Sequence, residues 1–154
     1  MAEPKELTAD NVKYLVVHCS DTYARMNTDA KEIDRWHRQR GFLRIGYHFV
    51  IRRNGAVQAS PDCRATNVPG AHVDGYNSQS LGICMIGGKG DDNQPANNFT
   101  DDQFVSLAQV LSKLLVQFPR AEIVGHHTLN HTKACPCFDV KQWWHETVAA
   151  PGVD

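Results

Sequence analysis

The stretch Tyr14-Leu15-Val16-Val17-His18-Cys19-Ser20 decides how this sequence folds. Its apolar, partly β-branched run shows no helical period, which predicts a buried strand in the centre of a sheet. The strand ends in His18, and a neutral imidazole is a common metal ligand. Because it stands at the end of the strand, His18 can reach an ion that other segments also hold.

The rest of the chain predicts alternating strands and helices. Asp29 with Glu32, and Thr100 with Gln103, have the spacing of a capping box, which is typical of helix starts. The predicted elements are a strand over 12–18, a helix over 29–41, a hairpin over 45–58 that turns at Asn54-Gly55, a strand over 81–86, a helix over 100–118, a strand over 122–125 and a helix over 140–148.

This order of elements predicts an α/β fold, with a central mixed β-sheet flanked by helices on its faces. The chain has 154 residues, which suffices for a single domain with one buried core. We expect that domain over residues 12–150. The polar residues 1–11 are expected to form a flexible lead-in.

Composition limits the partners of the protein. The formal net charge of -1 gives no overall attraction to phosphate backbones, so we expect no nucleic-acid partner. No apolar run approaches the length of a membrane helix, and the N-terminal residues lack the apolar core of a signal peptide. The five cysteines do not have the spacing of a disulfide framework. We therefore expect a monomer made in a reducing cytoplasm, without membrane insertion.

The stretch Gly125–Cys137 concentrates metal ligands. It holds three histidines, two cysteines and a lysine in thirteen residues. Imidazole and thiolate are the ligands that zinc prefers, and a catalytic zinc has three protein ligands and one open position. We therefore predict a catalytic zinc held by His18, His126 and Cys135.

A series of short motifs stands in order along the chain. These are His18-Cys19-Ser20, Ile33-Asp34-Arg35-Trp36-His37, Gly46-Tyr47-His48-Phe49, Gly75-Tyr76-Asn77, Leu81-Gly82-Ile83, Lys133-Ala134-Cys135-Pro136 and Phe138-Asp139. Together they resemble the zinc-dependent N-acetylmuramoyl-L-alanine amidases of phages, of the phage T-seven lysozyme type. The peptidoglycan recognition proteins are more distant relatives. The resemblance covers roughly residues 12–145, nearly the whole chain.

The resemblance implies the same kind of fold and a definite reaction. The reaction is hydrolysis, by zinc-activated water, of the amide between N-acetylmuramic acid and L-alanine in peptidoglycan, as in a phage endolysin that lyses the bacterial cell wall. Carried over by position, the zinc ligands are His18, His126 and Cys135, and the catalytic side chains are Tyr47 and Lys133. The Lys133 ammonium would stabilise the oxyanion of the tetrahedral intermediate, and Tyr47 would donate a hydrogen bond to it or orient the water.

Each predicted ligand has a neighbouring rival. The rivals are His127 beside His126, Cys137 beside Cys135 and Cys19 beside His18. The stretch before Lys133 is one residue longer than the resemblance leads us to expect, which keeps His127 open. The glycine before His126 and the Lys-Ala pair before Cys135 favour the first member of each pair. Consecutive residues of a strand point to opposite faces, so only one of His18 and Cys19 should face the site.

Residues 60–80 form a long polar segment, which in a compact domain is more often a binding loop than an idle connection. From this loop we expect His72 and Asn77 to contact the substrate, because their short polar groups suit peptide and sugar amides.

Other functions remain open at this point. The main alternative is a non-catalytic peptidoglycan-binding module, although the presence of Cys135 argues against it. A second role in inhibiting the phage RNA polymerase is also implied by the resemblance, and a cysteine-histidine hydrolase would work without metal. As an endolysin, the protein is expected to accumulate in the host cytoplasm and to reach the wall after another protein permeabilises the membrane.

Overall fold

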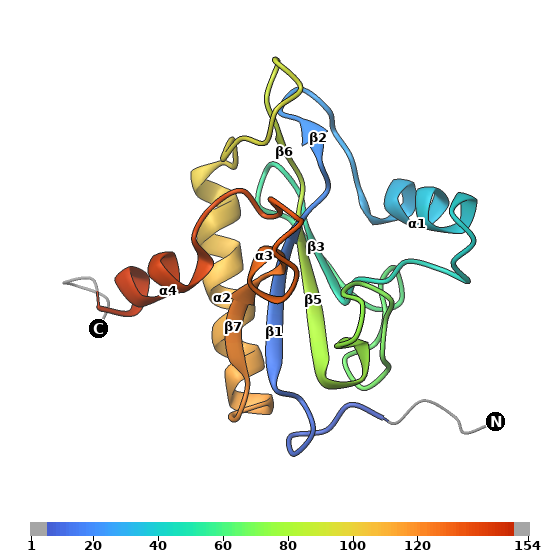
Figure 1. Cartoon of the computed structure of the whole chain (residues 1–154), viewed down its shortest axis with the longest axis vertical. Coiled ribbons are helices and arrows are strands. Elements are labelled where there is room, and N and C mark those ends of the chain that lie inside the picture. Colours follow the sequence, from blue (N-terminus) through green and yellow to red (C-terminus); the bar gives the residue numbers. More distant parts are fainter. Residues whose placement is uncertain (1–5, 150–154) are drawn as a thin grey trace.

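The computed structural model describes residues 6–149 and contains the predicted mixed sheet (Figure 1). Its strands are β1 (Tyr14–Cys19), β3 (Phe49–Ile51), β4 (Val57–Gln58), β5 (Ser80–Met85) and β7 (Glu122–Gly125). They lie in the order β4-β3-β5-β1-β7. The hairpin of β3 and β4 is antiparallel, and the other three pairs are parallel. The sequence prediction of a central first strand is thus confirmed.

Helices cover both faces of the sheet, as predicted (Figure 1). α2 (Asp101–Gln117) packs on one face with α4 (Val140–Ala149) beside it, and α1 (Ala30–Gln39) packs on the other face. Successive residues of β5 serve the two faces, since Ile83 belongs to the first core and Cys84 to the second. Within residues 6–149, no helix combines the length and apolarity needed to cross a membrane.

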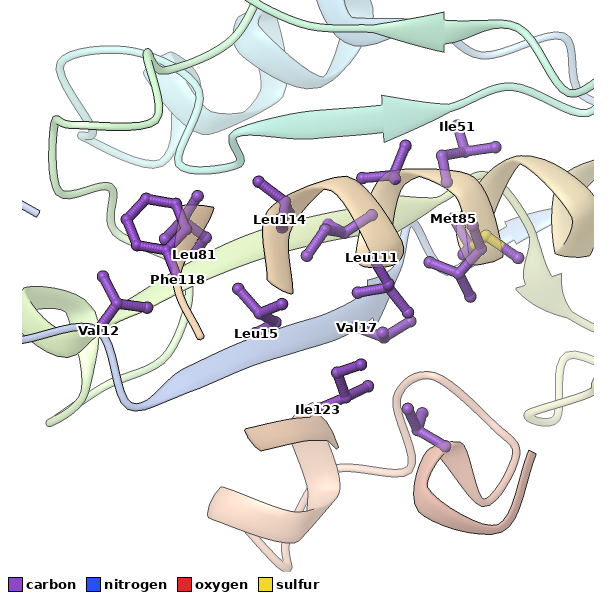
Figure 2. Packing of buried hydrophobic residues seen from close by; sticks show 14 of the residues in the cluster. Val12, Leu15, Val17, Ile51, Leu81, Met85, Leu111, Leu114, Phe118 and Ile123 are labelled. Atoms are coloured by element: carbon purple, nitrogen blue, oxygen red, sulfur yellow. The ribbon is translucent and has the colours of Figure 1, made fainter. Parts of the chain in front are cut away.

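The larger core lies between α2 and the sheet (Figure 2). Leu15 and Val17 of β1 face Leu111 and Leu114 of α2, and all four side chains are buried. These contacts follow from the 3.6-residue period of the helix and the two-residue period of the strand, which place one apolar stripe of each against the other. Burial of such side chains supplies most of the favourable free energy of folding.

The N-terminus of α2 is fixed by a buried glutamine. Thr100 and Gln103 form the predicted capping box, in which the Thr100 hydroxyl accepts a hydrogen bond from the Gln103 backbone and the Gln103 side chain accepts one from the Thr100 backbone. The Gln103 amide also donates to the carbonyl oxygens of Ile51 and Ile86, at 3.1 and 2.9 Å. The cap therefore also joins α2 to the ends of β3 and β5.

Several short elements were not predicted from the sequence. β2 (Thr22–Tyr23) pairs with β6 (Gly88–Lys89) in a separate small parallel sheet, and α3 (His126–Leu129) is a single turn directly after β7. Elements of two to four residues are too short to show a hydrophobic period. Tyr47 was predicted to lie on a hairpin strand, but β3 begins only at Phe49, so Tyr47 lies in the irregular segment before it.

The predicted lead-in differs from the structure over its second half. Residues 1–5 lie outside the described residues. Leu7 is buried in the larger core, and its backbone N–H donates to the carbonyl of Asn67 at 2.8 Å. Thr8 and Asn11 close a turn by hydrogen bonds between side chain and backbone. Leu7 and its hydrogen bond to Asn67 therefore hold residues 6–11 on the domain.

A buried histidine ties the hairpin segment to its surroundings. His48 is fully buried, and its Nδ1 accepts the backbone N–H of Gly82 on β5 at 3.0 Å. Its Nε2–H donates to the carbonyl of Val68 at 2.7 Å. Burial lowers the pKa of His48 to about 4, so the ring is neutral near pH 7, with one donor and one acceptor that match these two partners.

His48 makes the stability of the fold depend on pH. The unfolded chain takes up a proton at this residue near pH 6.5, and the folded chain resists protonation down to about pH 4. The contribution of His48 is therefore complete above pH 6.5 and decreases as the pH falls toward 4, by about 3 kcal/mol in all. The free energy of unfolding can be measured by urea titration, with chelator present, at about pH 7 and about pH 4.5. Its decrease between the two pH values should be smaller for His48→Asn than for wild type. Equal losses in the two proteins would contradict this assignment.

Candidate metal centre

Three side chains from distant parts of the chain converge beyond the carboxyl ends of the parallel strands. His18 lies near the end of β1, His126 directly follows β7, and Cys135 lies in the loop between α3 and α4. One ligand atom from each lies within 4.8 Å of the other two. Two imidazoles and a thiol at this spacing form the donor set of a zinc site with one open position. The residues therefore fit a bound metal ion.

The electrostatics keep both imidazoles neutral, which a metal ligand requires. Burial lowers the pKa of His18 well below its usual value, and the neighbouring His72 and His126 lower it further. The pKa of His126 is also lowered, mainly by burial and then by the charges of Lys133 and His127. Each ring therefore keeps an unprotonated nitrogen with a lone pair at neutral pH.

The position of the Cys135 sulfur is set by backbone hydrogen bonds. The N–H of Cys19 donates to Cys135 Sγ at 2.8 Å. The carbonyl of Cys135 accepts the N–H of His127 at 2.9 Å, so the loop is held to α3. These two contacts bring the loop back against the ends of β1 and β7.

The structure separates the predicted ligands from their rivals. His127 does not belong to the group of converging donors, and its Nδ1 is buried without a hydrogen-bond partner. Cys137 Sγ donates to the carbonyl of Gly88 at 3.3 Å, away from the donor group. A Cβ atom on Gly88 would stand 2.7 Å from Cys19 Sγ, so both rival thiols lie against this glycine. The side-chain interaction with Cys135 is the main cause that raises the pKa of the Cys19 thiol.

The converging donors open into a cleft of about 740 Å³. Its wall includes all of the predicted catalytic and substrate-binding residues, namely Tyr47, His72, Asn77 and Lys133. It also includes Trp36 and His37 of α1 and the following Arg40 and Phe42, which sequence reasoning did not assign to the site. The motif Ile33-Asp34-Arg35-Trp36-His37 contains two of these residues and is part of the family resemblance. A helix sequence alone, however, does not reveal which cavity a face of the helix borders.

Tyr47 lies against the donor group. The centre of its ring is 5.0 Å from that of His18. The preceding Gly46 is held by His37, whose Nδ1 accepts the Gly46 N–H at 3.0 Å. Burial raises the pKa of the Tyr47 phenol well above its usual value, and the thiols of Cys84, Cys135 and Cys19 add to this effect. Tyr47 is therefore a hydrogen-bond donor and not a base at neutral pH.

Lys133 lies at the exposed side of the cleft. Its backbone N–H donates to the carbonyl of Asn130 at 3.0 Å, which shapes the turn between α3 and Cys135. Its ammonium acts on His126, whose pKa it lowers. An exposed cation beside the donor group can stabilise negative charge that develops on a molecule in the cleft.

The two residues predicted to contact substrate are engaged within the protein. His72 is buried, and its ring nitrogens lie within hydrogen-bond distance of His18 and Ser80. Asn77 Oδ1 accepts the backbone N–H groups of His72 and Val73, at 3.0 and 2.8 Å. His72 therefore has no free ring nitrogen to offer a substrate, and the Asn77 oxygen organises the loop. The sequence identified both as special but could not reveal these partners.

Comparison with known proteins gives a consistent result. The family described as N-acetylmuramoyl-L-alanine amidase matches residues 8–138. The endolysin of Klebsiella phage KP32 is 42% identical over 146 residues, which cover 95% of this chain and 94% of the relative. The endolysin of Escherichia phage T7 is 39% identical, with the same coverage of both chains.

The solved structures agree on the fold. The N-acetylmuramoyl-L-alanine amidase LysC from Clostridium intestinale superimposes with a TM-score of 0.74 at 24% identity. The match covers 96% of this chain and 92% of LysC.

The paired histidines allow a direct test of the donor group. His126→Ala removes one of three converging ligands and should lose the tightly bound metal ion, since the remaining pair leaves the coordination incomplete. His127→Ala is the matched control and should retain about one ion per chain after gel filtration, measured by elemental analysis. Retention by His126→Ala together with loss by His127→Ala would reverse the assignment.

Proposed function

The chain belongs to the N-acetylmuramoyl-L-alanine amidase family, and from this premise we propose that it is a zinc-dependent phage endolysin. Its reaction is hydrolysis of the amide between N-acetylmuramic acid and L-alanine in peptidoglycan, which lyses the cell wall. The observation that carries the zinc dependence is the convergence of His18, His126 and Cys135 at the base of the cleft.

Zinc suits this donor set better than other common ions. Two neutral imidazoles and one thiolate are borderline-soft ligands, whereas magnesium and calcium select oxygen. When bound, zinc polarises the carbonyl of the amide and lowers the pKa of water from about 15.7 to roughly 7. The protein supplies the fixed ligands, and the cleft leaves one side of them open to substrate.

The side chains around the donor group supply the remaining chemistry. Attack of water on the amide carbon moves negative charge onto the carbonyl oxygen. The protonated Tyr47 hydroxyl donates a hydrogen bond toward that oxygen, and the Lys133 ammonium balances its charge. The C–N bond then breaks, and the nitrogen takes up the two protons of the attacking water, so that L-alanine leaves with a free ammonium group. The products are a lactyl carboxylate on the glycan and a free stem peptide.

The alternatives differ from this function in what they require. A non-catalytic peptidoglycan-binding module would bind zinc and release no peptide. A cysteine-histidine hydrolase would cleave without metal. Inhibition of the phage RNA polymerase and accumulation in the host cytoplasm stay predictions. A transcription assay with the cognate polymerase and excess protein tests the first of these.

Chelation tests the zinc dependence. Purified peptidoglycan should release stem peptides that begin with L-alanine, identified by mass spectrometry. The release should stop after chelation and return when Zn²⁺ is restored, because the ligands remain in the folded protein. Zinc binding without release would favour the binding module, and release indifferent to chelation would favour thiol chemistry.

Removal of the cleft lysine tests the catalytic role of its charge. Lys133→Ala should leave zinc bound and lower the hydrolysis rate by about 10²–10³-fold, a typical loss for a group that stabilises an oxyanion. Lys113→Ala is the matched control, because Lys113 is an exposed lysine on α2 that does not line the cleft. Full activity of Lys133→Ala would disprove the role.

A further inference from the structure

We propose that His72 is a positioning residue that fixes the tautomer of His18 through a directed hydrogen-bond chain ending at the carbonyl of Tyr76. The hydrogen bonds run from His18 through His72 and Ser80 to Tyr76. It leaves the lone pair of His18 on Nδ1, the nitrogen that is free to bind the metal. The inference rests on the proposed function in one respect, namely that His18 is a ligand.

The contacts of the chain are specific to individual atoms. His18 Nε2 lies 2.9 Å from His72 Nδ1, and His72 Nε2 lies 3.2 Å from Ser80 Oγ. Ser80 Oγ donates to the carbonyl oxygen of Tyr76 at 2.7 Å. His18, His72 and Ser80 are each buried, so no bulk water competes for these atoms.

The direction of the chain follows from its last member. A backbone carbonyl can only accept, so the single proton of the Ser80 hydroxyl points at Tyr76. Ser80 Oγ must then accept from His72, which places the His72 proton on Nε2. The His72 Nδ1 is consequently an acceptor and takes the proton of His18 Nε2. One carbonyl therefore determines both imidazole tautomers.

His72 carries a single ring proton in this arrangement. The ring is buried, and its hydrogen-bond partners are His18 and Ser80, neither of which is a carboxylate that could balance a positive charge. The ring therefore has one donor and one acceptor. A doubly protonated ring would have no acceptor for His18.

The fold holds His72 in place independently of any ligand. Its ring lies over Gly82 of β5, where a Cβ atom would stand 2.7 Å from the His72 Cγ. Asn77 accepts the His72 backbone N–H and fixes the start of this loop turn. The sheet has a glycine at the point where the ring needs space, so any larger residue there would displace the ring.

The hydrogen-bond chain matters because the two tautomers of an imidazole interconvert readily when no partner selects one of them. With the proton on Nδ1, His18 would offer its lone pair at Nε2, the nitrogen that faces His72. Groups that orient a metal-binding histidine in this way typically account for a 10- to 100-fold difference in metal affinity. We expect His72 to make a contribution of this size.

The first experiment reads the tautomers directly. Long-range ¹H–¹⁵N correlation spectra of the histidine rings distinguish Nε2–H from Nδ1–H, in the full chain with and without zinc. We expect Nε2–H at His72 in both samples. In Ser80→Ala the acceptor is lost, and the His72 spectrum should move toward Nδ1–H. A wild-type His72 with its proton on Nδ1 would overturn the inference.

The second experiment measures zinc affinity by competition with a chromogenic chelator. His72→Leu should weaken binding by about 10- to 100-fold. His72→Asn retains a side-chain oxygen near the former Nδ1 and should recover most of that loss, since it can still accept from His18. A purely structural role would rank the two variants by stability instead, so thermal unfolding is measured in parallel. Equal affinity of wild type and His72→Leu would overturn the inference.

His48→Asn is the matched control. His48 is as deeply buried as His72, but its nitrogens bond only to the backbone of Gly82 and Val68. Its substitution should lower stability and leave zinc affinity within about threefold. If His72→Leu does not fold, the spectrum and zinc affinity of Ser80→Ala carry the test. If the chain binds no zinc at all, the proposed function fails, and the His72 tautomer of the metal-free chain still tests the hydrogen-bond chain.

Discussion

The parallel pairing of β1 with β5 and β7 is the constraint on which the rest of the structure depends. Parallel strands end at the same edge of a sheet, so the residues that follow them share one surface. This register brings His18 to the same place as His126, which directly follows β7. Hydrogen bonds from the backbone of Cys19 and His127 then hold the loop that carries Cys135 against this edge and complete the group.

The site combines two opposite demands on its histidines. A ligand must be neutral and must keep a lone pair, which burial provides by lowering the pKa of His18 and His126. Burial also makes every unpaired ring nitrogen costly, by about 1–3 kcal/mol. His48 and His72 meet this cost with backbone and side-chain partners. The buried imidazoles of the site are therefore hydrogen-bonded and neutral, and the charged Lys133 lies on the exposed side of the cleft.

The sequence predicted the features that depend on local patterns. The capping box at Thr100, the hairpin at Asn54-Gly55 and the buried β1 are each encoded within a few residues. The metal-binding group was also predictable, because its residue types are rare together. The role of His72 was not predictable, since its partner His18 is 54 residues away and the contact depends on the rotation of two rings. The two-residue strands β2 and β6 are too short to carry a periodic signal.

The contact between Cys19 and Cys135 spans 116 residues of sequence. An ion bound by His18, His126 and Cys135 therefore closes residues 18–135 into a loop. By mass action, such an ion stabilises the folded state over the unfolded state, by about 2.7 kcal/mol when free metal is at 100 times its dissociation constant. Where metal ions are chelated, the hydrolytic activity of the site and the resistance of the protein to proteases would therefore decrease together.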